Sequence, residues 1–206
     1  MLKIINYCLD LLFPPRRTEL TVRRVTSREL TTLFRPDNIK NVRFLTTYSN
    51  PLIEALIKEN KYYENTRAAR ALAEIITLWI QTQPSRRLVL VPIPQSILRA
   101  REREHNQVES ILKYIKLPEF VTINTQLIQK SRHTPTQTSL KRKARFLNVR
   151  DSFSLLPHAE LASLSGATIV IVDDVVTTGA TMDAARASLA PHLPQNTDII
   201  LLALAH

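Results

Sequence analysis

The segment ATIVIVDDVVTTGATMDA, residues 167–184, decides the fold class of this chain of 206 residues. It contains the β-branched run 169–172, and such a continuous apolar run is typical of a strand buried on both faces of a parallel sheet. Asp173 and Asp174 stand where this strand is expected to end. From about Thr181 the apolar residues recur at helical spacing, which predicts a helix. A strand, a polar loop and a helix in this order form one unit of an α/β fold.

The loop between this strand and this helix has the composition of a phosphate-binding loop. Free backbone N–H groups and the positive end of a helix dipole converge at such a helix N-terminus. The chain has two glycines, where average usage predicts about 14, and one of them is Gly179 in this loop. A glycine allows close approach of a ligand or a positive φ. The alternative is an ordinary polar turn with an N-cap threonine, which leaves two adjacent carboxylates at the strand end unexplained.

Composition limits the classes of protein and partner. The formal net charge of +10 favours an anionic partner, namely a nucleic acid, a polyphosphate or an acidic membrane, although a basic surface can also be merely solvated. The single cysteine, Cys8, excludes internal disulfides and a cysteine-based zinc site, as expected for a cytoplasmic protein. No apolar run approaches the roughly 18 residues of a membrane span, so we expect neither membrane insertion nor a targeting signal.

The flanking sequence adds a second strand–loop–helix unit. The apolar run 88–91 is followed by prolines at 92 and 94 and by a helix expected to end near Lys116. Two such units predict an α/β fold with a parallel-rich sheet, right-handed crossovers, flanking helices and a small hood. The other predicted elements are helices over 2–12, 27–34, 51–57 and 66–80 and strands over 19–25, 42–48, 121–123, 127–129 and 198–205.

Two basic segments are candidates for contacts with ligand charge. Arg103 shares a helix face with Asn106 or Gln107, which would present a guanidinium and an amide to a pyrophosphate. The neighbouring Arg99 and Arg101 are better explained as a solvated helix face. Residues 132–153 are basic and lack an apolar period, which fits either a loop that closes over a phosphorylated ligand or a plain surface loop.

The stretch from Asp173 to Thr181 resembles the ribose-phosphate motif of type I phosphoribosyltransferases: two acidic residues, two apolar residues, then T-T-G-x-T. In that family the carboxylates contact the ribose 2′- and 3′-hydroxyls of phosphoribosyl pyrophosphate (PRPP), and the threonine–glycine loop holds the 5′-phosphate. The resemblance implies catalytic roles for Asp173 and Asp174. It also implies a phosphate site formed by Thr177, Thr178, Gly179, Ala180 and Thr181.

The order of the remaining motifs resembles the ComF/GntX branch of phosphoribosyltransferase-like proteins. These motifs are F-P-P at 13–15, I-K-E-N-K-Y at 57–62, V-P-I-P at 91–94, R-E-H-N-Q at 103–107 and T-P-T-Q at 134–137. The branch usually carries a four-cysteine zinc ribbon after F-P-P, which this chain lacks. We therefore expect a helix and a ribbon-replacing segment over 1–41, and a phosphoribosyltransferase-like domain over 42–206. Glu104 and His105 depart from the branch, where glycine and phenylalanine are usual, and His105 is best explained by packing.

The resemblance implies a protein that binds PRPP with Mg²⁺ carried by PRPP oxygens, without zinc, and with Arg103 and Lys61 on the pyrophosphate. Thr177 stands where purine-salvage relatives have an aspartate base, which argues against a 6-oxopurine substrate. Three functions stay open: transfer of the phosphoribosyl group to an unidentified acceptor, sensing of PRPP without turnover, and a ComF-type role in DNA uptake with single-stranded DNA or a competence protein as partner. An oligomer is compatible with each. Against a DNA partner, the aromatic content is only 6%, and no aromatic–basic stacking platform stands out in the sequence.

Overall fold

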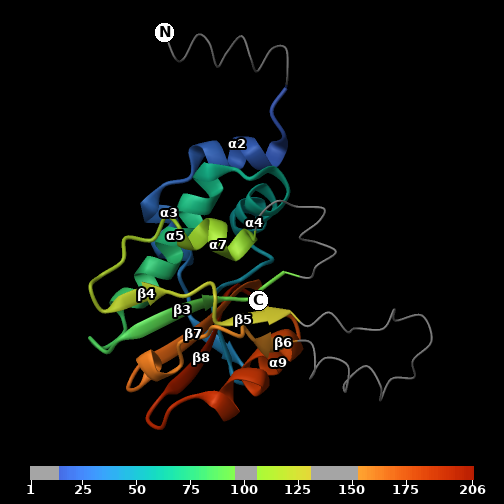
Figure 1. Ribbon diagram of the computed structural model, residues 1–206. Helices are drawn as coiled ribbons and strands as arrows, with labels where there is room; N and C mark the ends of the chain where they lie inside the picture. The colour runs from blue at the N-terminus through green and yellow to red at the C-terminus, as the bar shows by residue number, and fades with distance from the viewer. Residues whose placement is uncertain (1–13, 96–105, 131–152) are drawn as a thin grey trace, which may run out of the picture.

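The computed structural model describes residues 14–95, 106–130 and 153–206 (Figure 1). The predictions for the first helix, for Arg103 and for the basic segment 132–152 lie outside these ranges. The described elements are α2 (Arg17–Arg24), α3 (Ser27–Leu33), β1 (Asp37–Ile39), β2 (Val42–Thr46), α4 (Pro51–Tyr63), α5 (Thr66–Gln81), β3 (Leu88–Pro92), α7 (Gln107–Leu112), β4 (Val121–Ile123), β5 (Ile128–Lys130), β6 (Phe153–Leu155), β7 (Thr168–Val175), α9 (Ala180–Leu189) and β8 (Asp198–Ala205).

Six strands form one sheet in the order β1-β2-β8-β7-β3-β4. Strand β1 is antiparallel to β2, and every other neighbouring pair is parallel. The two long strands β7 and β8 lie in the middle, with Ile169 opposite Ile199 and Asp173 opposite Ala203. The antiparallel pair β5–β6 forms a separate small sheet. The predicted α/β fold with a parallel-rich sheet is confirmed.

Alternation along the central strands divides the interior into two layers. Val170, Val172 and Leu202 belong to the cluster that contains the buried faces of α4, α5 and α7. The intervening Ile169 and Ile171 belong to the cluster that contains the buried face of α9. Figure 1 shows the corresponding arrangement, with α4, α5 and α7 on one side of the sheet and α9 on the other. Because side chains alternate across a strand, a continuous apolar run is what a sheet covered on both faces requires.

Local sequence signals predicted the positions of several elements correctly. Asn50 caps α4 by accepting hydrogen bonds from the N–H groups of Leu52 and Ile53, and Pro51 occupies the first helical position, as predicted. Strand β8 covers the predicted residues 198–205. Strand β7 runs past its predicted end at residue 172 and includes both aspartates.

The predicted strand over 19–25 is wrong, because these residues lie in helix α2 and the turn after it. Within α2 only Val22 is buried, and Glu19 accepts an ion-pair contact of 2.8 Å from Arg23 one helical turn later. The helix packs against α4, so a single apolar contact and helical charge spacing override the strand propensity. The predicted helix up to Lys116 is shorter than expected, since α7 ends at Leu112. Among the described residues, no helix is both long enough and apolar enough to span a bilayer.

Candidate functional site

The two aspartates lie at the carboxyl end of β7, and the side chain of each accepts a hydrogen bond from the backbone N–H of the next residue. Oδ1 of Asp173 accepts a 2.8 Å hydrogen bond from the N–H of Asp174, and Oδ1 of Asp174 accepts a 2.8 Å hydrogen bond from the N–H of Val175. Oδ2 of Asp174 is buried and has no hydrogen-bond partner among the described residues. Burying a polar atom without a partner is costly. This oxygen therefore marks a place where a ligand hydroxyl or a hydrated cation would be bound favourably.

The environment of Asp173 favours the protonated acid. Burial first, and the neighbouring charge of Asp174 second, raise the pKa of Asp173 to about 8, while the positive charge of Lys61 acts to lower it. Lys61 lies in the last turn of α4. The fold thus brings Lys61 into the electrostatic environment of the aspartates, although its contact with a pyrophosphate stays a prediction. A cation or hydroxyl donor bound here would favour the ionised form of Asp173.

The loop after β7 presents backbone N–H groups that no described residue uses. Val176 donates its N–H to the carbonyl of Ala205 at 2.9 Å, but the N–H groups of Thr177, Thr178 and Gly179 have no acceptor among the described residues. Helix α9 begins at Ala180 immediately afterwards, and the first N–H groups of a helix have no partner within it. The loop therefore has the donors that an anion requires.

Gly179 is required by both its conformation and its surroundings. Its φ is +79°, in the left-handed region that side chains disfavour. A Cβ added at this position would lie 3.2 Å from Cγ2 of Val42 and 3.9 Å from Oδ2 of Asp183. Of the two alternatives that the sequence left open, close approach of a ligand or a positive φ, the structure shows the positive φ. The close approach differs from the one expected, because the side of Gly179 that lacks a Cβ faces strand β2.

Residues at the ends of β3 and α4 and at the start of α7 contact one another beside the end of β7. Ile93 donates its N–H to Val172, and its carbonyl accepts a 2.9 Å hydrogen bond from Nδ2 of Asn106. The Asn106 side chain also caps α7, so its carbonyl oxygen and one of its two amide hydrogens are used within the fold, and its contact with a pyrophosphate stays a prediction. Gln107 differs, because its Nε2 is buried without a partner among the described residues. Asn60, next to Lys61, donates to the carbonyl of Gln107 at 3.2 Å.

One contact of the loop was not predicted from the sequence. The two-residue turn between β1 and β2 lies against it: Nζ of Lys40 donates to the carbonyl of Thr178 at 3.3 Å, and Nδ2 of Asn41 donates to Oδ1 of Asp183 at 2.6 Å. More than 130 residues separate the two segments. No local pattern reveals this contact, since it depends on the pairing of β2 with β8.

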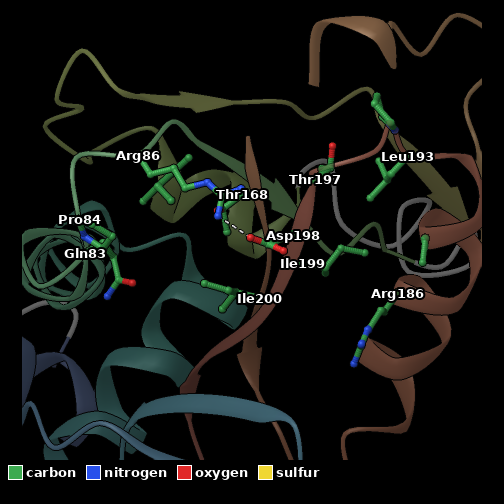
Figure 2. A pocket seen from close by; sticks show the side chains of 13 residues that line it. Gln83, Pro84, Arg86, Thr168, Arg186, Leu193, Thr197, Asp198, Ile199 and Ile200 are labelled. Carbon is green, nitrogen blue, oxygen red and sulfur yellow. Dashed lines mark hydrogen bonds and ion pairs between the residues drawn. The ribbon is translucent and has the colours of Figure 1, made fainter. Parts of the chain in front are cut away.

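A hollow lies at the opposite edge of the sheet from the aspartates, at the amino ends of β3, β7 and β8 (Figure 2). It has a volume of about 670 Å³ and is lined partly by Leu88, Leu193 and Ile199. Arg86 crosses this region to pair with Asp198, and it also donates to two backbone carbonyls. The hollow contains no residue of the 173–181 stretch, so we assign the candidate site to the carboxyl edge.

Comparison with known proteins finds one similar sequence and several similar structures. Over 151 residues the chain is 26% identical to "Competence protein F" of Haemophilus influenzae, covering 66% of this chain and 60% of that protein. It is similar in structure to a hypoxanthine phosphoribosyltransferase of Staphylococcus aureus, with a TM-score of 0.40, 13% identity and coverage of 67% of this chain and 64% of that chain. The corresponding values for a hypoxanthine-guanine phosphoribosyltransferase of Bacillus anthracis are 0.40, 14%, 67% and 69%.

A family model matches most of the chain, including the residues of the candidate site. The model described as "Phosphoribosyl transferase domain" matches residues 60–206, which include Lys61, the Asp173–Asp174 pair and the whole loop before α9. This range is most of the chain, and we conclude that the protein belongs to the phosphoribosyl transferase domain family.

Proposed function

We propose that the protein binds PRPP with Mg²⁺ at the carboxyl edge of the sheet and that this binding is its central activity. The observation that carries the proposal is the buried, unpartnered Oδ2 of Asp174 beside a loop whose N–H groups are unused by described residues. The carboxylates would accept hydrogen bonds from the ribose hydroxyls. The loop before α9 would bind the 5′-phosphate at a helix N-terminus.

The same residues would support phosphoribosyl transfer. Displacement of pyrophosphate from the anomeric carbon develops positive charge on the ribose, and fixed carboxylates stabilise such charge. Asp174 would supply this field, joined by Asp173 once a bound cation or hydroxyl donor favours its ionised form, while Lys61 would neutralise charge on the pyrophosphate. Within the described ranges no three His, Cys, Asp or Glu side chains come together as a metal site. Mg²⁺ would be carried mainly by PRPP oxygens and water.

Calorimetry with Mg²⁺-PRPP tests the proposal. We expect the wild type to bind. Asp174→Asn should lower turnover, measured as pyrophosphate release, by more than it lowers affinity. Glu119→Gln, which removes an exposed carboxylate elsewhere, should change neither. Thermal melts check folding, and pyrophosphate release against a panel of acceptors separates transfer from sensing. Absence of binding at millimolar PRPP by folded wild-type protein would refute the proposal.

A second candidate function is a competence-related role in which the protein binds single-stranded DNA. The relative from Haemophilus influenzae is named for competence, and the structure adds a specific observation. Tyr62, Tyr63 and Tyr114 are 57%, 50% and 39% exposed. The guanidinium of Arg16 lies 3.6 Å from the centre of the Tyr63 ring, and that of Arg70 lies 5.1 Å from the Tyr114 ring. Exposed aromatic rings with adjacent cations are what base stacking and phosphate contact require.

The DNA-binding proposal makes its own prediction. Tyr62→Ala should weaken binding of a fluorescent single-stranded oligonucleotide about tenfold or more, since stacking contributes about 1–3 kcal/mol per base. Tyr62→Phe, which keeps the ring, should bind like the wild type. Affinity should also fall steeply between about 50 and 200 mM salt. Equal binding by the alanine and phenylalanine variants would exclude a stacking role for this residue.

A further inference from the structure

The turn between β1 and β2 holds the candidate phosphate loop by three neighbouring contacts. Lys40 donates from Nζ to the carbonyl of Thr178 at 3.3 Å, and the following Asn41 donates to Asp183 in the first turn of α9. Val42 then lies so close to Gly179 that a Cβ there would approach it to 3.2 Å. Three consecutive residues of one segment therefore contact three positions of the loop and helix start.

The contact of Lys40 fixes the direction of a donor on the other side of the loop. The peptide bond between Thr178 and Gly179 is planar and trans, as are all described peptide bonds. In a trans peptide the carbonyl and the following N–H point in opposite directions. Because Lys40 attracts the Thr178 carbonyl, the N–H of Gly179 must point away from the β1–β2 turn.

Gly179 by itself does not determine this orientation. Rotating the 178–179 peptide by half a turn changes φ of Gly179 greatly, and glycine tolerates both signs of φ. Lys40 is in turn held in an unfavourable conformation, with φ of +55°. A two-residue turn between antiparallel strands requires a positive φ, so the pairing of β1 with β2 holds the Lys40 backbone in this conformation.

We propose that Lys40 is a positioning residue that selects the peptide orientation in which the Gly179 N–H faces the bound 5′-phosphate. The ammonium does so by holding the Thr178 carbonyl on the opposite side of the loop. The proposal deepens the proposed function and rests on it as far as the phosphate is concerned. Its structural half, the selection of one peptide orientation, can be tested without any ligand.

Amide NMR provides the ligand-free test, and the sequence favours it because the chain has two glycines. In the wild type, Gly179 should give a single sharp amide resonance. In Lys40→Met it should broaden or double as the two peptide orientations exchange. Gly166 has φ of +70° and lies just before β7, at the other end of this strand from Gly179. It is the internal reference, and its amide resonance should be unchanged. An unaltered Gly179 resonance in Lys40→Met would overturn the proposal, whatever the protein binds.

Titration with ribose 5-phosphate provides the functional test. Lys40→Met should weaken binding about tenfold, and Lys40→Arg should restore it to within about threefold. Lys116→Met, which removes an exposed charge elsewhere, should leave it unchanged. Lys40→Gly is the most discriminating variant, because it relieves the backbone strain while removing the ammonium, so it should melt no lower than the wild type yet bind as weakly as Lys40→Met.

Two outcomes of this titration would overturn the positioning role. One is full affinity in Lys40→Gly, and the other is an equal loss in Lys116→Met, which would show that net charge alone matters. Failure of the wild type to bind ribose 5-phosphate would instead count against the proposed function, while the ligand-free NMR result would still decide the role of Lys40.

Discussion

Replacing each of the two glycines by alanine should separate backbone strain from crowding in the candidate loop. Both glycines have a positive φ, +70° at Gly166 and +79° at Gly179. An alanine Cβ at Gly166 would meet nothing within 4 Å, whereas one at Gly179 would lie 3.2 Å from Cγ2 of Val42. The Gly166→Ala variant is therefore a matched control that contains the strain without the contact.

The expected magnitudes follow from these two differences. A left-handed conformation costs an ordinary residue roughly 1–2 kcal/mol, and 1 kcal/mol corresponds to about 2–4 °C in a chain of this size. Gly166→Ala should therefore lower the melting temperature by about 2–8 °C. Gly179→Ala should cost roughly a further 1 kcal/mol or more, because Val42 is fully buried and cannot move away without disturbing its neighbours.

Binding should distinguish the two variants more sharply than stability does. The added Cβ at Gly179 faces β2, so it would act by displacing the loop and its N–H donors. We expect about a tenfold loss of affinity for ribose 5-phosphate in Gly179→Ala and none in Gly166→Ala, measured by calorimetry. Combining Val42→Ala with Gly179→Ala should cost less stability than the sum of the two single changes, with a favourable coupling of about 1 kcal/mol in a double-mutant cycle, and should recover part of the lost affinity. Equal stability of the two single variants, or no coupling to Val42, would refute this reasoning.

Two further predictions concern buried carboxylates. Burial and the charge of Asp174 raise the pKa of Asp173 to about 8, so the folded protein holds a proton there that the unfolded chain releases above about pH 4. Stability should therefore fall as the pH rises from 4 to 8. Thermal melts of Asp173→Asn should lack this slope, and the same slope in both proteins would contradict the assignment. Burial disfavours the charge of Glu59, but hydrogen bonds from Arg16, Thr18 and Asn65 outweigh it and hold its pKa below the usual value. This contribution to stability should be lost as the pH falls below about 4.5. Glu59→Ala should cost roughly 2 kcal/mol in chemical denaturation, as for hydrogen bonds to a charged group, and a loss under 1 kcal/mol would show that the anchor is dispensable.

The sequence predicted those features whose cause is local. The run 169–172 predicts a buried strand because both of its faces are apolar, and Asn50-Pro51 predicts a helix start because a cap and a fixed φ suffice for one. These two predictions require only a few adjacent residues, and the structure confirms both. The scarcity of glycine indicated either a close approach or a positive φ at Gly179, and its φ is +79°.

The features that could not be predicted depend on residues distant in the sequence. The hydrogen bond from Asn106 to the carbonyl of Ile93 depends on how the loop after β3 folds back, so no local pattern predicts it. Lys40 carries no motif, and its position follows from the register in which Val42 lies opposite Leu201. The exposed tyrosines were also missed, since Tyr114 joins Arg70 only after α5 and α7 have packed together.

The segment before β2 is connected to the candidate site at two places that differ physically. At one, Arg16 donates two hydrogen bonds, of 3.0 and 2.9 Å, to the fully buried carboxylate of Glu59, two residues before Lys61. At the other, Lys40 makes a single exposed contact with the phosphate loop. Salt screens an exposed contact much more than a buried one. Rising ionic strength should therefore loosen the candidate phosphate loop while α4 and Lys61 stay in place. The amide resonance of Gly179 should accordingly broaden at a lower salt concentration than the amide resonances of α4.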